Sequence, residues 1–410
     1  MSATLTLQAA CDVPYLSVSE VTKRIVRLTV ANNDHSWSAA RLPLNICLAL
    51  DRSSSMAGSK LDTLKAAAIS LIDHLGERDM IGVLAFDSKC EVIAPTTALF
   101  RDQKEQLQQR IAAIRTGNGT ALLEAYLKSA GMVADHLLSH GVNEVLLVTD
   151  GGANLPAHPD PKEVAKHADE LRKRGIQSSV YGIGADIKPF YLTPLSSYGG
   201  GSYTYLAGHG NAQMFQPRQN HLLHVVARDT TLRIAMPSGA KMRLLGDLPH
   251  SQDTLSIPIG NLSSGQTATL YVEILAATGQ AGKSLPLNCT LSYLDNEDER
   301  IHQSLKATFV YADHATAKSA PRDYEVRQGA ELVKMGYAIH KALYLNDRKQ
   351  HAEAVSSLHQ AISKIKYLSP AQVNELKTLA EKIERHALGK SEYLSQFHQA
   401  YRWQAMRKGE

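Results

Sequence analysis

A cluster of small oxygen-bearing side chains follows a strongly apolar run near residue 50. The run LNICLAL (44–50) leads directly into Asp51, Arg52 and the three serines that begin at Ser53. These polar side chains are unsuited to a hydrophobic core, whereas a hard cation needs several small oxygen donors around a carboxylate. The cluster therefore raises the question of whether other segments of the chain supply further ligands of the same kind.

Two later segments carry matching groups. RTGNGTALLEA (115–125) places Thr120 between a glycine-rich turn and a helical pattern. VLLVTDGGAN (145–154) places Asp150 at the end of a second apolar run, followed by two glycines, Gly151 and Gly152, that allow close backbone approach. Open α/β sheets bind ligands at the carboxyl ends of their strands. The candidate metal ligands are Asp51, Ser53, Ser55, Thr120 and Asp150, and these hard oxygens favour Mg²⁺, Ca²⁺ or Mn²⁺ over zinc.

These five residues resemble a known motif. Their order and spacing are similar to the DxSxS…T…D metal-ion-dependent adhesion site of von Willebrand factor A (VWA) domains, across about 43–213. FDSK (86–89) and SSYGGGSYTYL (196–206) resemble the same family, whereas Ser54 stands where that family usually has glycine. The resemblance implies that the five residues ligate the metal directly or through water. It also implies that a partner's acidic side chain completes the octahedron.

The pattern around this motif predicts the fold that positions it. Near-continuous apolar strands alternate with helical patterns at about 60–75, 103–114, 121–139 and 161–174. Such alternation is typical of a mostly parallel sheet with helices on both faces. We expect a Rossmann-like α/β domain over residues 43–213.

The segments on either side of this domain show a different pattern of apolar and polar residues. Residues 1–42 and 220–313 show short strands with alternating apolar and polar residues, which favours one β-sandwich interrupted by the α/β domain. The alternative is an independent downstream sandwich with the first strands merely packed nearby. Residues 322–410 show apolar positions at helical spacing, with Pro370 at an expected helix start. We expect a C-terminal helical module that forms a hairpin or small bundle rather than a repeat array.

Bulk composition narrows the class of protein. The chain has 410 residues, 44% hydrophobic content and a formal net charge of +4. No apolar run is long enough to span a bilayer, and the N-terminal segment lacks the features of a signal peptide. The four scattered cysteines are typical of reduced, packed thiols. We expect a cytoplasmic protein with neither a nucleic-acid partner nor membrane insertion.

Simpler interpretations of the same residues compete with the metal site. One of the serine hydroxyls after Asp51 could instead cap a helix that begins near Gly58. His136 and His140 lie one helical turn apart, but without a glutamate partner we expect them to be surface residues.

An enzymatic interpretation also competes. A strand that ends in aspartate is found in haloacid-dehalogenase-type phosphatases, but their general acid would stand at Ser53 here. Neither a phosphate-binding GxxxxGK[ST] loop nor a GxSxG elbow occurs in the chain. We therefore expect no enzyme activity.

The function expected from these patterns is metal-dependent protein binding. The resemblance is to intracellular VWA proteins of bacterial type that act as scaffolds or adaptors, and such relatives often work beside AAA+ ATPases or with kinase and phosphatase partners. The partner would present an exposed Asp or Glu. Two alternatives stay open: a metal-dependent hydrolase or phosphatase, and a protein that assembles with itself through the same site.

Overall fold

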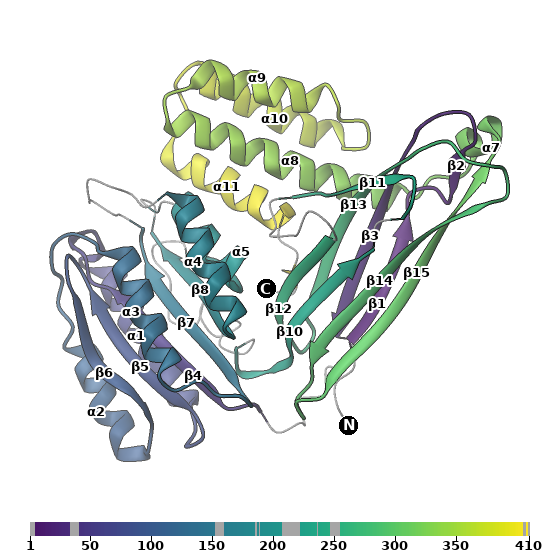
Figure 1. Ribbon diagram of the computed structural model, residues 1–410. Helices are drawn as coiled ribbons and strands as arrows, with labels where there is room; N and C mark the ends of the chain where they lie inside the picture. Colours follow the sequence, from purple (N-terminus) through teal and green to yellow (C-terminus); the bar gives the residue numbers. More distant parts are fainter. Residues whose placement is uncertain are drawn as a thin grey trace.

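The computed structural model describes residues 5–32, 41–151, 160–184, 187, 189–206, 222–235, 237–246, 255–404 and 407–408. These residues form an α/β unit, a unit of two β-sheets and a set of C-terminal helices (Figure 1). The predicted end of the α/β domain at residue 213 and the predicted close approach at Gly152 lie outside the described residues. Within the described ranges, no helix combines the length and hydropathy needed to cross a bilayer.

The α/β unit is built on a six-stranded sheet in the order β6-β5-β4-β7-β8-β9. All neighbouring strands are parallel except β6, which runs antiparallel to β5. Every residue of β4, β7 and β8 is buried, which explains why these strands are continuous apolar runs in the sequence. The strands are β4 (Leu44–Asp51), β5 (Met80–Phe86), β6 (Cys90–Ala98), β7 (Val142–Thr149), β8 (Ile176–Ile183) and β9 (Gly200–Leu206).

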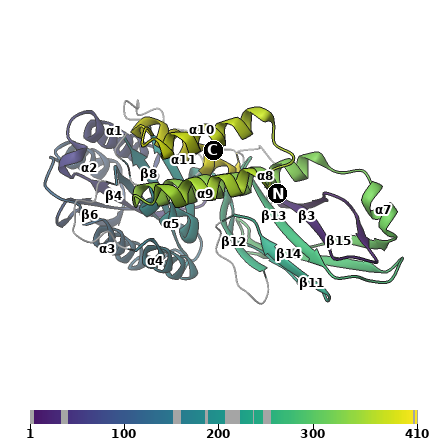
Figure 2. The same cartoon turned by 90° about the horizontal axis from the view of Figure 1, so that it is seen from above.

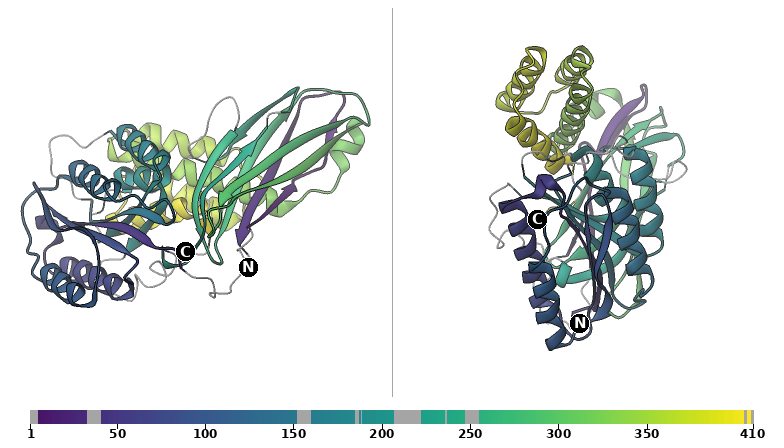
Figure 3. Two further views of the ribbon diagram at one scale, coloured as in Figure 1. Left: turned by 60° about the horizontal axis from the view of Figure 1, so that its bottom comes forward. Right: turned by 90° about the vertical axis from the view of Figure 1, so that its left-hand side faces the viewer.

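Helices cover both faces of this sheet (Figure 3), as the alternating pattern predicts. One face packs against α1 and α2 and the other against α3, α4 and α5, each around its own hydrophobic cluster. The helices are α1 (Ser59–His74), α2 (Arg101–Ala112), α3 (Leu122–Ala134), α4 (Pro161–Lys173) and α5 (Pro189–Gly199). The predicted mixed α/β fold with a mostly parallel sheet is confirmed.

The structure corrects one helix of this unit. The helix expected over 121–139 ends at Ala134, so His136 and His140 do not lie one turn apart on a helix. At this end of the helix the side-chain amide of Asn45 donates to the carbonyls of Val133 and His136 at 2.9 and 2.8 Å. A side chain from a distant strand thus takes carbonyls that another turn of helix would have used.

The sequence did not lead us to expect three elements of the α/β unit, namely β6, α5 and β9. Strand β6 contains Pro95 and has several exposed residues, so its sequence lacks a clear alternation. Helix α5 contains Pro194, which is unfavourable inside a helix. Strand β6 and helix α5 exist because tertiary packing outweighs local preference.

Strands from both sides of the α/β unit pair within the same two sheets. One sheet has the order β1-β3-β13-β11 with β16 also paired to β13, and the other has the order β12-β10-β14-β15-β2. The first sheet contains β1 (Leu5–Cys11), β3 (Thr22–Asn32), β11 (Ala240–Leu244), β13 (Thr267–Ala276) and β16 (Arg407–Lys408). The second contains β2 (Tyr15–Ser17), β10 (Val225–Ile234), β12 (Leu255–Ser263), β14 (Ser284–Leu294) and β15 (Arg300–Ala312).

Strand β3 is an interior strand of the first sheet. It pairs with β1 on one side and with β13 on the other, from Ala31↔Thr267 to Thr22↔Ala276. Residues of both sheets form one shared hydrophobic cluster, to which β3 contributes Val26, Leu28 and Val30. The opening segment is therefore part of this sheet rather than a neighbour packed beside it.

The C-terminal helices lie across both other units (Figures 1 and 2). Helices α8 to α11 share a core of their own, and Pro370 occupies the first turn of α10 behind a capping box formed by Ser369 and Gln372. The helices are α7 (His314–Ser319), α8 (Tyr324–Asp347), α9 (His351–Ile362), α10 (Pro370–Glu384) and α11 (Lys390–Gln404).

Helices α8 and α11 dock on the other two units. Helix α8 packs Val326 and Ala330 against Tyr271 on the outer face of the first sheet. Helix α11 packs against the α/β unit through aromatic rings: His398 stacks on Tyr205 with ring centroids 4.0 Å apart. Burial lowers the pKa of His398 to about 4, so its ring is neutral at pH 7 and packs as an aromatic group.

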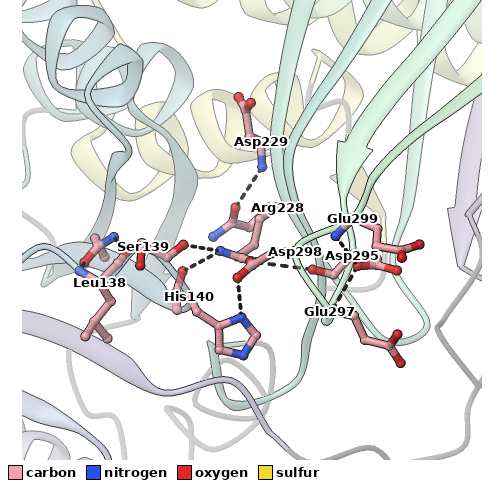
Figure 4. A network of polar contacts seen from close by, with 12 residues as sticks. Leu138, Ser139, His140, Arg228, Asp229, Asp295, Glu297, Asp298 and Glu299 are labelled. Carbon is pink, nitrogen blue, oxygen red and sulfur yellow. Dashed lines mark hydrogen bonds and ion pairs between the residues drawn. The ribbon is translucent and has the colours of Figure 1, made fainter.

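A buried arginine joins the α/β unit to the two sheets (Figure 4). Arg228 of β10 is 5% exposed, and its guanidinium donates to the carbonyls of Ser139 and Gly141 at 3.3 and 3.2 Å. The same group binds the carbonyl of Asp295 and the carboxylate of Asp298 in the β14–β15 turn. One side chain therefore ties a loop before β7 to a turn of the second sheet.

The interior position of β3 predicts the effect of a core truncation. Leu28→Ala leaves a cavity between the two sheets and should lower the free energy of unfolding by about 3 kcal/mol in urea denaturation. Thr29→Ala, one residue along on the opposite face of the strand, should change it by less than about 1 kcal/mol. Equal effects of the two variants would contradict a shared core that includes β3.

The arginine bridge predicts a second effect. Arg228→Met leaves the carbonyls of Ser139, Gly141 and Asp295 without this donor, so hydrogen exchange should speed up in residues 138–142 and 295–299. The free energy of unfolding should fall by about 3 kcal/mol. Arg233→Met on the same strand is the matched control, because Arg233 is exposed, and it should leave both quantities unchanged. Unchanged exchange in Arg228→Met would mean that the bridge does not hold the two units together.

Candidate metal centre

Two carboxylates meet where neighbouring parallel strands end. Strands β4 and β7 are paired in register, with Leu50 opposite Val148. Asp51 is the last residue of β4, and Asp150 directly follows β7. Both acids are completely buried at this carboxyl edge of the sheet. The pairing of the strands therefore places both acids at one edge, although 99 positions separate them in the chain.

Hydroxyl groups link the two carboxylates. The backbone N–H of Ser53 donates to Asp51 Oδ1 at 2.8 Å, and the hydroxyls of Ser53 and Ser55 lie 3.1 Å apart. The Ser55 hydroxyl donates to Asp150 Oδ1 at 3.0 Å. A continuous chain of hydrogen bonds thus joins four of the five residues predicted to bind a metal.

Thr120 is held near this chain by its backbone. The loop that carries it donates from Gly117 N to the carbonyl of Arg52 at 2.7 Å and from Ala121 N to the carbonyl of Asp87 at 2.6 Å. Thr120 is completely buried. These bonds place the loop of the fifth predicted ligand against the loops that follow β4 and β5.

The structure adds three polar residues that sequence reasoning did not assign to the site. The Thr149 hydroxyl donates to Asp51 Oδ2 and accepts from Gly151 N at 2.9 Å. The Arg52 guanidinium donates to Asp87 Oδ2 at 3.0 Å and so holds together the loops after β4 and β5. The sequence offers one signal for each: Thr149 precedes Asp150, Arg52 lies between the acid and the serines, and Asp87 belongs to FDSK.

A lysine forms an ion pair with one of the two acids. The Lys60 ammonium donates to Asp150 Oδ2 at 2.9 Å. Its side chain is 18% exposed and comes from the first turn of α1. Sequence reasoning also missed this residue, because nothing in the local pattern shows that the first turn of α1 reaches Asp150.

The serines do not cap a helix. The N-cap residue of α1 is Gly58, so no serine side chain caps this helix. Ser53 precedes a short 3₁₀ helix (Ser54–Met56), and its hydroxyl makes no cap hydrogen bond either. The hydroxyls of Ser53 and Ser55 bond to each other and to Asp150 instead. The capping interpretation of the serine cluster is therefore wrong.

The electrostatics of the site favour a bound cation. Burial, with a smaller contribution from the nearby charge of Asp150, raises the pKa of Asp51 to about 6 despite the hydrogen bonds from Thr149 and Ser53. At neutral pH, Asp51 is therefore an ionised carboxylate in surroundings that disfavour its charge. A cation beside it would remove this penalty.

The donor set decides which cation fits. Besides the backbone N–H of Ser53 and the ammonium of Lys60, the polar groups around the two acids are hydroxyls, and hydroxyl and carboxylate oxygens suit Mg²⁺, Ca²⁺ or Mn²⁺. In the described part of the chain, no group of three or more His, Cys, Asp and Glu side chains is placed to hold a metal, so a site rich in charged or sulfur ligands is not found there. A site here would rely on two carboxylates and several neutral hydroxyls.

A family comparison identifies the α/β unit. Residues 45–215 match the family model described as the von Willebrand factor type A domain. This segment is a VWA domain. The match covers the strands that end in Asp51 and Asp150 and the loop of Thr120, so the predicted site lies entirely within the VWA domain.

Comparisons over the whole chain agree with this assignment. An uncharacterized protein of Synechocystis is 28% identical over 348 residues, covering 75% of this chain and 80% of that protein. A solved von Willebrand factor type A structure from Catenulispora acidiphila matches 99% of this chain and 98% of its own, with a TM-score of 0.74 at 16% identity. The ArnB paralog VWA2 from Sulfolobus acidocaldarius matches 99% of both chains, with a TM-score of 0.65 at 14% identity. The two solved structures show a shared fold and nothing finer.

The raised pKa of Asp51 predicts a pH-dependent stability in EDTA. An acid whose pKa is higher in the folded state adds stability below its unfolded pKa, near 3.8, and this contribution is lost as pH rises through about 6. Asp51→Asn has no acid at this position, so its stability does not fall in this pH range for this reason. Its free energy of unfolding relative to wild type should therefore increase from pH 4 to pH 7, by at most about 3 kcal/mol.

The control for this measurement is Asp62→Asn. Asp62 is an exposed acid on α1, so Asp62→Asn changes the net charge by the same amount without replacing a buried acid. A flat difference for Asp51→Asn would show that the charge of Asp51 is not penalised in the folded protein.

Proposed function

We propose that the VWA domain binds a divalent cation, Mg²⁺ by preference, through Asp51, Ser53, Ser55, Thr120 and Asp150. The observation that supports this most strongly is the chain of hydrogen bonds from Asp51 through Ser53 and Ser55 to Asp150. It gathers small oxygen donors around two buried acids at the edge of the sheet where α/β proteins bind ligands.

We propose further that the site is used to bind a protein. VWA domains are generally protein-interaction modules. Because the proposed ligands include only two acids, a bound divalent cation would retain the ability to attract an acidic side chain of a partner. The chain's own residues would hold that cation and shield the contact from bulk water, which strengthens a charged bond. The partner is then a protein with an exposed Asp or Glu, met in the cytoplasm, and the chain is a scaffold or adaptor.

The other two units support the VWA domain in this proposal. We interpret the paired sheets as a β-sandwich into which the VWA domain is inserted, followed by a helical module. Arg228 and the aromatic contacts of α11 hold the VWA domain against both. Such a frame presents the metal edge in a constant orientation to a partner.

We do not propose catalysis. The hydroxyls of Ser55 and Thr149 and the ammonium of Lys60 engage the two carboxylates, and we propose that these acids serve a metal rather than act as bases. Hydrolysis of generic phosphoesters that requires both Mg²⁺ and Asp51 would overturn this part of the proposal.

Metal titration tests the ligand set. Asp51→Ala or Asp150→Ala removes a charged ligand and should abolish Mg²⁺ binding in calorimetry, while Ser53→Ala or Thr120→Ala should weaken it by about tenfold or less because water can replace a hydroxyl. Asp62→Ala is the control, since it removes an exposed acid from α1 and should bind as wild type does.

The same variants test the protein-binding role. A partner captured in Mg²⁺ should be lost in EDTA and in Asp51→Ala, and concentration-dependent association of the purified chain in Mg²⁺ would identify the partner as a second copy. Normal Mg²⁺ binding by Asp51→Ala would refute the metal site. If wild type bound Mg²⁺ but captured its partner equally well in EDTA, only the role of the metal in partner binding would be refuted.

A further inference from the structure

Lys60 is held beside the proposed metal site by its surroundings. Its stem packs over Gly184, where a side-chain Cβ would come within 2.5 Å of Lys60 Cε. Gly184 directly follows β8 and has a φ of +88°, a conformation that favours glycine. The backbone after β8 therefore leaves room for the lysine stem, and the ammonium reaches Asp150 from a fixed direction.

Both carboxylate oxygens of Asp150 are engaged by groups that respond differently to a metal. Oδ1 accepts from the Ser55 hydroxyl and Oδ2 accepts from the Lys60 ammonium. A hydroxyl can rotate its hydrogen away and offer a lone pair to a cation, whereas an ammonium has three donors and no lone pair. Ser55 can therefore change from a donor to a ligand, but Lys60 can only oppose a second cation at the same carboxylate.

The charges at the site lead to the same conclusion. Asp51 and Asp150 carry two negative charges when ionised, and Lys60 offsets one of them. When a divalent cation is added, the net charge of the two acids, Lys60 and the cation becomes +1. Without Lys60 this net charge would be zero. The lysine thus makes the site less attractive to a metal and more attractive to an anion once the metal is bound.

We propose that Lys60 is a built-in competitor cation that weakens divalent-metal binding and leaves the loaded site with one positive charge for a partner's carboxylate. This inference rests on the proposed metal site and concerns its regulation. It assigns to Lys60 a role that differs from a structural ion pair, because a structural pair would stabilise the fold without changing the affinity for a metal.

The test is a Mg²⁺ titration of purified full-length variants by calorimetry. Lys60→Met removes the ammonium but keeps a long apolar stem, and it should bind Mg²⁺ about tenfold more tightly than wild type. Lys60→Arg keeps the charge and should bind as weakly as wild type. Lys65→Met is the matched control, because Lys65 lies on the same helix and donates to the carbonyl of Ala112 rather than to an acid.

The increase in melting temperature caused by Mg²⁺ provides a second measurement, which a structural role of Lys60 would not change. In EDTA, Lys60→Met should melt below wild type, because Asp150 is left buried without its counter-charge. Saturating Mg²⁺ should raise its melting temperature by more than it raises that of wild type, because tighter binding gives a larger shift. A purely structural lysine would lower both melting temperatures and leave the Mg²⁺-induced increase unchanged.

The outcomes separate this inference from the proposed function. Equal Mg²⁺ affinity in wild type, Lys60→Met and Lys65→Met would overturn the competitor role and leave the metal site intact. Tighter binding in both Lys→Met variants would also overturn it, because net charge alone would then account for the effect. If none of the proteins bound Mg²⁺ or Mn²⁺, the metal site and the competitor role would both be refuted.

Discussion

The burial of two carboxylates at the ends of adjacent parallel strands is the constraint to which the rest of the site responds. Asp51 and Asp150 are completely buried, and burial acts with the nearby charge of Asp150 to raise the pKa of Asp51. Burying the charge of a carboxylate is costly unless other groups compensate it. The backbone N–H of Ser53, the hydroxyls of Thr149 and Ser55 and the ammonium of Lys60 each supply part of this compensation. A divalent cation would supply the remainder.

Loops carry these groups, and backbone hydrogen bonds keep the loops in place. Gly117 N binds the carbonyl of Arg52, and the Arg52 side chain binds Asp87. A Cβ at position 117 would come within 1.9 Å of Asp87 Oδ2, so this approach of backbone to side chain requires glycine. Loops fixed in this way present ligands without a large entropy loss on binding, which is the advantage of a preorganised site.

The same sheet is anchored at its opposite edge. Arg228 binds the loop before β7, whereas Asp150 follows the other end of that strand. The aromatic rings of α11 pack on β9 at one side of the sheet. Arg228 thus anchors the VWA domain at the end of the sheet opposite to the proposed site, whereas the α11 contact at Tyr205 lies at the same carboxyl end, level with Thr149.

The sequence by itself determined the α/β fold and the identity of the candidate ligands, because both depend on local patterns. Apolar runs such as LNICLAL (44–50) are needed wherever a strand is covered on both faces, and Asp51 and Asp150 stand where such runs end. Tertiary structure decided the features that depend on distant contacts. Three contacts join segments far apart in the chain: Lys60 with Asp150, Asn45 with the end of α3, and Arg228 with the loop before β7. No local pattern encodes such contacts, because they form only when packing brings the segments together.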